Sequence, residues 1–291
     1  NTGYFEGENI CYIKEFTVPA AEKDKVHYLY FDGVYTNPSF VINGAFVKKF
    51  HHGYVPCCMR IDKYIRYDEP NVLKVSIRGT ALPNSRWYSG QGIYRDAWLL
   101  TGDRLHISQD GLHVTTLDCS EELAQIEVTA DVWNEGPSAR EGYAELTVLD
   151  GSGKVVAERK ARFYADANGK VLVRQRLTLD KPNLWDVDSP NLYSVKCRLT
   201  DRGTGETVDC EEAAFGIRKL QLDSKYGLRI NGRVVKLKGG CLPGCRIRGG
   251  CRGAQSAPAQ IHGLQCHPYG PQSPQYSTAE RLRPAGPAGD G

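Results

Sequence analysis

Asn84-Ser-Arg-Trp-Tyr-Ser-Gly-Gln-Gly-Ile-Tyr-Arg-Asp-Ala-Trp98 is the stretch around which the rest of the sequence is organised. Its first half is polar and aromatic, and a Gly-x-Gly turn then leads into mostly apolar residues, an order that predicts a loop carried on a strand. Aromatic faces stack on the C–H faces of sugar rings, arginine offers forked donors to hydroxyls, and glycine permits close backbone approach. The loop is therefore a candidate sugar-binding surface. The alternative that the residues leave open is a glycine-rich strand entry whose aromatic side chains belong to the core.

Residues 1–102 read as one all-β domain. Short alternating runs at residues 27–31, 39–43 and 71–77 are separated by turn pairs such as Asp32-Gly33 and Asn43-Gly44. Period-2 alternation with Asn-Gly and Asp-Gly turns, and without helical periodicity, is typical of antiparallel strands. The size of the segment suits a two-sheet jelly roll.

Residues 103–218 predict a second all-β domain. Alternating runs occur at residues 112–116, 125–132, 144–149, 171–177 and 193–199, with turns at Asp150-Gly151 and Asn168-Gly169. Roughly seven strands in a segment of this length favour an immunoglobulin-like sandwich. Residues 219–240 then predict a short β-hairpin, with turns at Lys225-Tyr-Gly227 and Asn231-Gly232.

Residues 241–291 have a different composition. They hold nine of the 31 glycines and seven of the 15 prolines of the chain, without any periodicity. Such a segment buries too little apolar surface to fold, so we expect an irregular, disordered tail. Its cysteines and His267 match no zinc-ligand spacing.

Composition and charge exclude several classes of function. The formal net charge is +3, and the tail accounts for all of it, so residues 1–240 carry no footprint for nucleic acid or for an anionic membrane. No apolar run approaches the roughly 20 residues of a membrane span.

The sequence does not start with Met and shows no signal-peptide pattern, so we expect a trimmed start. The ten cysteines are scattered, which favours reduced thiols and a cytoplasmic protein. His51-His52 with Cys57-Cys58 does not have the spacing of a zinc site, so solvated imidazoles are expected there and no metal or cofactor is predicted.

The opening stretch resembles the S-R-W-Y-x-G-x-G-I-Y-R-x-V-W-L signature of glycoside hydrolase family 2, the β-galactosidase and β-glucuronidase family. Other segments resemble that family in the same order along the chain. They are Tyr12-Ile-Lys-Glu-Phe-Thr-Val-Pro19, Phe31-Asp-Gly-Val34, Val41-Ile-Asn-Gly44, Asn183-Leu-Trp-Asp-Val-Asp-Ser-Pro-Asn-Leu-Tyr193, Phe215-Gly-Ile-Arg218 and Leu228-Arg-Ile-Asn-Gly-Arg-Val-Val-Lys-Leu-Lys-Gly239. The resemblance implies a sugar-binding jelly roll, an immunoglobulin-like sandwich, and a hairpin that opens a catalytic (α/β)8 barrel.

The resemblance also implies a function and a set of site residues. Retaining glycosidases use two carboxylates about 5–5.5 Å apart, and in this family both are barrel glutamates, so we expect no catalytic residue in this chain. Family position makes Asn84, Arg86, Trp87 and Tyr88 the candidate substrate-binding residues, for a terminal β-linked sugar in an intact enzyme. Members of the family are often homo-oligomers.

The Asn134-Glu135 pair resembles the family's catalytic pair, but it ends a predicted strand of the second domain and is expected to be a turn. The rival hypothesis is a stand-alone carbohydrate-binding or scaffold protein whose tail is genuine.

The genetic code offers an account of the tail. When the second and third bases of each codon are read with the first base of the next, the residues permitted from His262 to Gln275 include the string M-G-F-N-A-I-R-T-A-H-N-P-P-S. From Glu280 to Asp290 the same shift permits N-A-C-D-R-L-G-L-L-V-M. Both strings resemble the barrel entry of the family. We therefore expect a reading-frame shift soon after Cys241, in the gene or in its sequencing.

Overall fold

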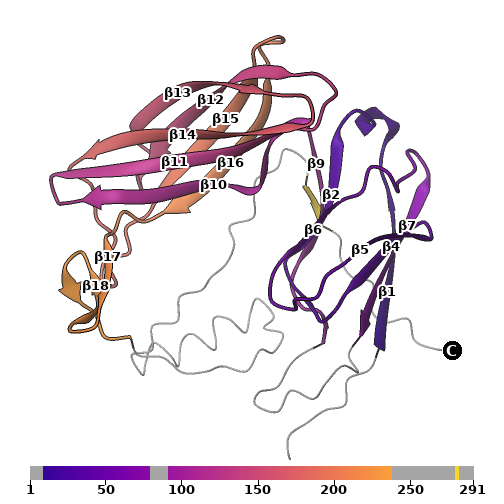
Figure 1. Ribbon diagram of the computed structural model, residues 1–291, viewed down its shortest axis with the longest axis horizontal. Coiled ribbons are helices and arrows are strands. Elements are labelled where there is room, and N and C mark those ends of the chain that lie inside the picture. Colours follow the sequence, from indigo (N-terminus) through magenta and orange to yellow (C-terminus); the bar gives the residue numbers. More distant parts are fainter. Residues whose placement is uncertain (1–8, 79–90, 238–278, 282–291) are drawn as a thin grey trace, which may run out of the picture. The chain divides into compact units, whose positions relative to one another are not determined.

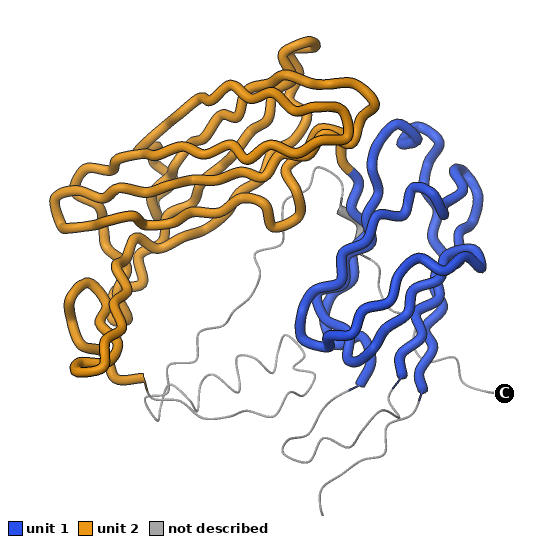
Figure 2. The backbone as a smooth tube through the Cα atoms, viewed as in Figure 1, with its two compact units in different colours: residues 1–101, 238–268, 278–291 blue, residues 102–237, 269–277 orange. Residues whose placement is uncertain are grey.

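The computed structural model describes residues 9–78, 91–237 and 279–281. Within these ranges the chain forms β-strands and one short 3₁₀ turn, and no α-helix. The strands pair into several antiparallel sheets, which confirms the all-β class. The described residues divide into two compact units, residues 9–78, 91–101 and 279–281 in unit 1 and residues 102–237 in unit 2 (Figures 1 and 2).

Unit 1 contains two four-stranded sheets and one two-stranded ribbon. Their strand orders are β1-β7-β4-β5, β20-β9-β2-β6 and β3-β8. The elements are β1 (Asn9–Thr17), η1 (Ala20–Glu22), β2 (Val26–Phe31), β3 (Val34–Tyr35), β4 (Ser39–Ile42), β5 (Ala45–Lys49), β6 (Cys57–Arg60), β7 (Pro70–Arg78), β8 (Gly92–Ile93), β9 (Ala97–Gly102) and β20 (Ala279–Arg281). The runs predicted at residues 27–31, 39–43 and 71–77 coincide with β2, β4 and β7 to within one or two residues.

Side-chain alternation builds the core of unit 1. Along β7 the side chains of Leu73, Val75 and Ile77 are buried, whereas those of Val72 and Lys74 point to solvent. Because successive residues of a strand face opposite sides of the sheet, one face of β7 enters the core and the other faces solvent. The buried face meets the equally apolar β2 and β4, and Leu29, Phe31 and Phe40 are among the largest fully buried side chains of the core.

Asn71 is a polar centre inside this apolar unit. Its side-chain oxygen accepts hydrogen bonds from the Arg66 backbone N–H at 2.7 Å and from Asn43 Nδ2 at 2.8 Å. Its own Nδ2 donates to the carbonyls of Arg66 at 2.8 Å and Glu69 at 3.1 Å. The side chain is fully buried, and the four bonds occupy both of its donors and both acceptor positions. Asn71 thereby joins the β4–β5 turn to the segment that enters β7.

We predict that Asn71→Ala lowers the free energy of unfolding of unit 1 by roughly 2–4 kcal/mol, because it leaves buried donors and acceptors without partners. Chemical denaturation followed by a probe in unit 1 measures this change. Lys74→Ala, on the solvent face of the same strand, is the matched control and should shift stability by less than about 0.5 kcal/mol. Equal effects of the two substitutions would contradict the role given to Asn71.

Unit 2 contains a seven-stranded sandwich and a small appended sheet. The sandwich pairs a three-stranded sheet, β10-β11-β14, with a four-stranded sheet, β13-β12-β15-β16, and the appended sheet has the order β17-β18-β19. The elements are β10 (Leu105–Cys119), β11 (Leu123–Asn134), β12 (Arg140–Leu149), β13 (Val155–Ala165), β14 (Gly169–Asp180), β15 (Tyr193–Asp201), β16 (Thr207–Phe215), β17 (Leu220–Asp223), β18 (Gly227–Ile230) and β19 (Arg233–Val234).

The sandwich has the features of an immunoglobulin-like fold. Inward-facing Ile126, Leu146 and Leu199 come from both sheets and are fully buried in one shared core. Tyr193 begins β15, and its hydroxyl accepts a hydrogen bond of 2.8 Å from the backbone N–H of Asn183, upstream in the chain. A tyrosine at the start of the sixth strand that bonds back to upstream backbone is the tyrosine corner of immunoglobulin-like domains. The predicted sandwich is therefore present.

The segment around Trp185 fastens the appended sheet to the sandwich. The Trp185 ring is buried against Gly216, where a Cβ atom would lie 2.7 Å from its Cδ1, and it lies 4.3 Å from the guanidinium carbon of Arg218. Asn231, in the β18–β19 turn, donates from Nδ2 to the Trp185 carbonyl at 3.0 Å. Arg233 pairs with the carboxylates of Asp186 and Asp188. The predicted turns of this hairpin are confirmed, and a third short strand, β19, extends it.

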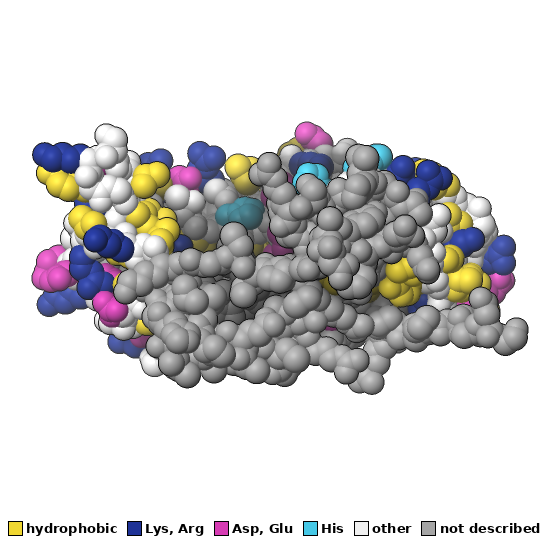
Figure 3. Space-filling model, turned by 90° about the horizontal axis from the view of Figure 1, so that it is seen from below, with side chains coloured by type: hydrophobic (Ala, Val, Ile, Leu, Met, Phe, Trp, Pro, Cys, Tyr) yellow, Lys and Arg dark blue, Asp and Glu magenta, His cyan; other side chains and the backbone are white. Residues whose placement is uncertain are grey.

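The appended sheet exposes apolar side chains on one face. Leu220 is 55% exposed and Leu222 is 82% exposed. Figure 3 shows hydrophobic side chains interspersed with charged ones over the end of unit 2 that carries this sheet.

The tail beyond residue 237 is described only at Ala279–Arg281. These three residues form β20, which pairs antiparallel with Trp98–Leu100 of β9. At these positions the chain is a strand, where the composition predicts irregular structure. Neither glycine nor proline occurs in Ala279-Glu-Arg281, so every residue can join a ladder. The expectation of disorder for the rest of the tail, and the barrel-like strings read from it, lie outside the described residues.

Candidate functional site

The four predicted sugar-binding residues belong to a segment whose flanking strands, β7 and β8, are described. Asn84, Arg86, Trp87 and Tyr88 themselves fall in residues 79–90, outside the described residues. The chain enters this segment from β7, whose last residue, Arg78, pairs with Asn9 of β1. It returns at Gln91 and passes into β8, which pairs with β3. The described residues around β3 and β8 are called the base of the loop.

Close contacts between glycines and tyrosine rings define the base of the loop. Gly92 has φ of +109°, and a Cβ atom on it would lie 2.5 Å from the hydroxyl oxygen of Tyr12. Gly33 lies under the ring of Tyr94, where an added Cβ would stand 2.5 Å from Cζ. Real Cβ atoms do not approach other atoms this closely, so a side chain at either position would force the facing tyrosine to move. The two glycines therefore allow these rings to pack directly on the backbone.

Tyr94 joins the base of the loop to the segment between β5 and β6. Its hydroxyl donates to the carbonyl of Gly53 at 2.8 Å. Burial raises the pKa of the Tyr94 hydroxyl, which keeps it protonated as a donor. Gly53 lies against the ring of Tyr35, with an added Cβ at 2.2 Å from Cδ2. The segment that carries His51 and His52 is consequently fixed beside β8.

Tyr35 and Tyr54 form an aromatic pair at this base. Their ring centroids lie 5.1 Å apart at an interplanar angle of 51°, and Tyr54 is 53% exposed. The half-buried Tyr35 and the exposed Tyr54 together offer an apolar face for stacking and hydroxyl groups for hydrogen bonds. His51 and His52, also exposed, add polar ring edges next to it in the chain. Sequence reasoning singled out none of these tyrosines as site residues, although each glycine that accommodates a ring lies in a recognisable turn.

Arg95 continues the polar character of the base. Its Nη1 lies 3.4 Å from Asp32 Oδ2, and its guanidinium carbon lies 5.7 Å from the centroid of the Tyr94 ring. The backbone N–H of Asp32 also donates to the carbonyl of Asp96 at 3.0 Å. These contacts fix the exit of β8 to the β2–β3 turn.

No group of three metal-ligating side chains occurs in the part of the chain that the structure describes. Cys57 is buried, and burial raises its pKa to about 11, so it remains a thiol and not a thiolate ligand. Cys57 forms no disulfide, and neither do Cys11, Cys119, Cys197 and Cys210. The exposed imidazoles of His51 and His52 agree with the solvated state expected from the sequence.

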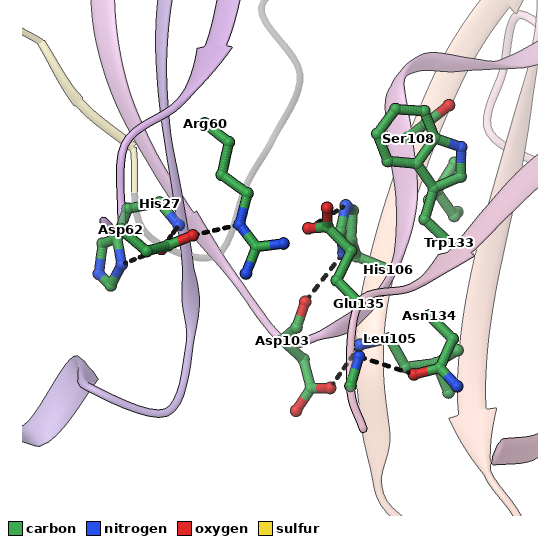
Figure 4. A network of polar contacts seen from close by, with 12 residues as sticks. His27, Arg60, Asp62, Asp103, Leu105, His106, Ser108, Trp133, Asn134 and Glu135 are labelled. Atoms are coloured by element: carbon green, nitrogen blue, oxygen red, sulfur yellow. Dashed lines mark hydrogen bonds and ion pairs between the residues drawn. The ribbon is translucent and has the colours of Figure 1, made fainter. Parts of the chain in front are cut away.

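Asn134 and Glu135 are structural residues, as the sequence predicts. Asn134 ends β11, is fully buried, and donates from Nδ2 to the carbonyls of Ser138 and Asp166 at 2.8 and 2.9 Å. Glu135 follows it, and its backbone N–H donates to the Arg104 carbonyl at 2.7 Å. The pair closes the turn after β11 (Figure 4).

Two other polar clusters, one in each unit, are also structural. In unit 1 the fully buried His27 places Nδ1 3.1 Å from Asp62 Oδ1, and Arg60 pairs with the second oxygen of the same carboxylate (Figure 4). Burial raises the pKa of Asp62, but the hydrogen bonds from His27 and Arg60 outweigh that effect and hold it below its ordinary value. In unit 2 His106 Nδ1 lies 2.9 Å from the carbonyl oxygen of Asp103. None of these contacts brings a nucleophile beside a base.

Comparisons with known proteins agree with this architecture. The family model described as glycosyl hydrolases family 2 matches residues 105–218. The chain is 35% identical over 231 residues to the β-galactosidase BoGH2A of Bacteroides ovatus, a match that covers 79% of this chain and 27% of that protein. It is 30% identical over 239 residues to a putative β-glucuronidase of Formosa agariphila, covering 82% of this chain and 22% of the relative.

Solved structures give the same result. A glycosyl hydrolase family 2 member from Bacteroides cellulosilyticus matches with a TM-score of 0.76 and 31% identity, over 82% of this chain and 32% of that one. A Bacteroides uniformis β-glucuronidase matches with a TM-score of 0.73 and 27% identity, over 82% of this chain and 29% of the other.

These similarities show that the chain is an all-β segment of the kind found in glycosyl hydrolases. The chain belongs to glycosyl hydrolases family 2. It spans only 27% and 22% of the two curated relatives described above. Among the described residues no helix is long and apolar enough to cross a membrane.

We predict that Gly92→Ala destabilises unit 1 by more than Gly44→Ala does. Gly44 also has positive φ, +83°, but an added Cβ there meets nothing within 4 Å, so its substitution reports backbone strain alone, about 1–3 kcal/mol. Gly92→Ala adds the clash with the Tyr12 hydroxyl. In the Gly92→Ala/Tyr12→Phe double variant the nearest remaining ring atom stands at 3.6 Å, so the excess should disappear. Thermal unfolding of these three variants and of Tyr12→Phe alone measures this, and an excess that persists without the hydroxyl would contradict the assigned contact.

Proposed function

We propose that this chain is the N-terminal carbohydrate-binding and spacer portion of a retaining glycoside hydrolase that removes terminal β-linked sugars, and that it binds sugar without hydrolysing it. The observation that carries the proposal is the set of contacts around residues 91–95 in a chain of family 2, where glycines lie against tyrosine rings and Tyr54 and Arg95 are exposed. The relatives that support it are a β-galactosidase and β-glucuronidases.

In this proposal unit 1 supplies the binding surface. Tyr35 of β3 and Tyr54, whose ring meets it, add an aromatic and polar surface to the set proposed at Asn84, Arg86, Trp87 and Tyr88, because β3 pairs with β8, the strand that follows those residues in the chain. Aromatic faces and hydroxyl donors suit a pyranose, which presents C–H faces and hydroxyl groups. Unit 2 is the spacer. Its outward charges pair with one another across strands, as Lys160 does with Glu145 at 2.8 Å, and offer no comparable surface.

The absence of catalysis follows from the two carboxylates that a retaining mechanism requires. The family resemblance implies that both carboxylates lie in a barrel beyond residue 240. The tail, as translated in the reading frame of this chain, does not have the sequence of that barrel. The out-of-frame strings support a frameshift as the origin of the tail. Five described cysteines, Cys11, Cys57, Cys119, Cys197 and Cys210, form no disulfide, which supports a reducing, cytoplasmic location.

The rival is a stand-alone carbohydrate-binding or scaffold protein with a genuine tail. The pairing of β20 with β9 is the one observation that favours it, because it gives three residues of the tail a structural place. Translation of the gene in the shifted frame after Cys241 separates the two hypotheses. A barrel sequence with an Asn-Glu pair and a later nucleophilic glutamate supports the fragment, and a stop codon or random sequence supports the rival.

We predict that the purified chain does not turn over aryl β-galactosides or β-glucuronides. Hydrolysis measured by release of the chromophore should equal the rate in buffer. Turnover that disappears when a residue within 1–240 is substituted would show that the chain has its own catalytic groups, and would overturn the assignment.

In the frame-restored enzyme, Trp87→Ala and Arg86→Ala should raise KM more than they lower kcat. A group that contacts the sugar at a distance from the reacting bond binds the ground state and the transition state equally. Its loss therefore appears mainly in KM. For Trp87 the expected loss is about 1–3 kcal/mol, by analogy with stacking of bases on aromatic rings. Lys74→Ala, on an exposed strand face of unit 1, is the control and should leave both constants unchanged. A fall in kcat at constant KM would move these residues out of the binding role.

A further inference from the structure

β9 is an apolar strand with both of its faces covered. Ala97, Leu99, Leu100 and Thr101 are all between 5% and 8% exposed, so successive residues are buried on opposite sides of the sheet. β2 lies along one edge of β9, and the other edge meets only β20 in the described sheet order. A straight apolar strand with a free edge presents unpaired N–H and C=O groups and acts as a template for another strand.

β20 occupies that edge through its main chain. Ala279 pairs with Leu100, Glu280 with Leu99 and Arg281 with Trp98, in antiparallel register (Figure 1). Strand addition of this kind draws its affinity from backbone hydrogen bonds, so it tolerates many side chains. This explains how a segment with the composition of the tail can take up a regular structure at this place.

We propose that the outer edge of β9 is a strand-acceptor site, and that its occupant in this chain is the C-terminal segment around Ala279–Arg281. The site recognises an extended peptide without proline through main-chain hydrogen bonds. It is distinct from the loop at residues 79–90 and does not depend on sugar binding.

Proline substitutions in β20 test the pairing in the full-length chain. Neighbouring N–H groups of a strand point to opposite sides, so one of Glu280→Pro and Arg281→Pro must remove a donor that faces β9. Ser256→Pro, elsewhere in the tail, is the control. The measured quantity is amide hydrogen exchange at Trp98–Leu100, resolved residue by residue.

Exchange should change at alternate residues only. Amides of β9 that face β20 should exchange on the order of tenfold faster or more in at least one of the two proline variants, while those that face β2 stay protected. Ser256→Pro should leave both sets unchanged. Unchanged exchange in both β20 variants would overturn the proposal. The proposal would also be overturned if light scattering showed the wild-type chain to be a dimer and both proline variants kept the protection of β9. A second copy of the chain would then occupy the edge.

A peptide added in trans tests how the site recognises its occupant. The peptide Tyr-Ser-Thr-Ala-Glu-Arg-Leu-Arg, with the sequence of residues 276–283, should restore protection to the proline variant that lost it. A peptide of the same composition in shuffled order should also restore protection, and one with proline at its centre should not. Restoration by the native order alone would contradict recognition through the main chain.

Discussion

Tyrosine rings lie directly on glycine backbone at the base of the loop, and the shape of unit 1 around the candidate site depends on this contact. The ring of Tyr94 covers Gly33, and its hydroxyl reaches past it to the Gly53 carbonyl at 2.8 Å. One side chain therefore fixes two turns that are separate in sequence. A side chain at Gly33 would force the Tyr94 ring to move and would so disturb both turns.

The motifs by which the family is recognised have different physical roles in the two units. In unit 1 the motif glycines allow close packing beneath the loop that carries the candidate binding residues. In unit 2 Trp185 belongs to a motif of the same family, yet it is buried against Gly216 and joins the sandwich to the appended sheet. A shared motif therefore marks a structural joint in one place and adjoins, in sequence, the proposed binding residues in the other, and only the packing distinguishes them.

The sequence predicts the elements better than it predicts the site. Strands with clean alternation, such as β7 and β11, are evident from their apolar residues. β13 and β16 were not among the named runs, because much of their sequence is charged. In the structure the charges of β13 face solvent and pair across strands, as Lys160 does with Glu145 of β12, whereas Glu211 of β16 is buried. Strand pairing supplies the partners that a local window of sequence does not contain.

Tyr35 and Tyr54 show the same limit at the candidate site. Residues 36–53 separate them in the chain, and nothing in either local sequence indicates that their rings meet. Their contact at 5.1 Å arises because Gly53 admits the Tyr35 ring and Tyr94 holds Gly53 in place. The family resemblance directed attention to residues 84–88, whereas the contact between Tyr35 and Tyr54 follows only from the fold.

The central claim is that unit 1 presents a sugar-binding surface at the base of this loop. The most direct test is a titration of the isotopically labelled chain with methyl β-galactoside and methyl β-glucuronide, followed by amide chemical shifts. The account predicts saturable shifts for at least one sugar, confined to residues 79–95 and to the amides of Gly53 and Tyr54. Shifts confined to unit 2, or none with either sugar at concentrations up to the solubility limit, would contradict it.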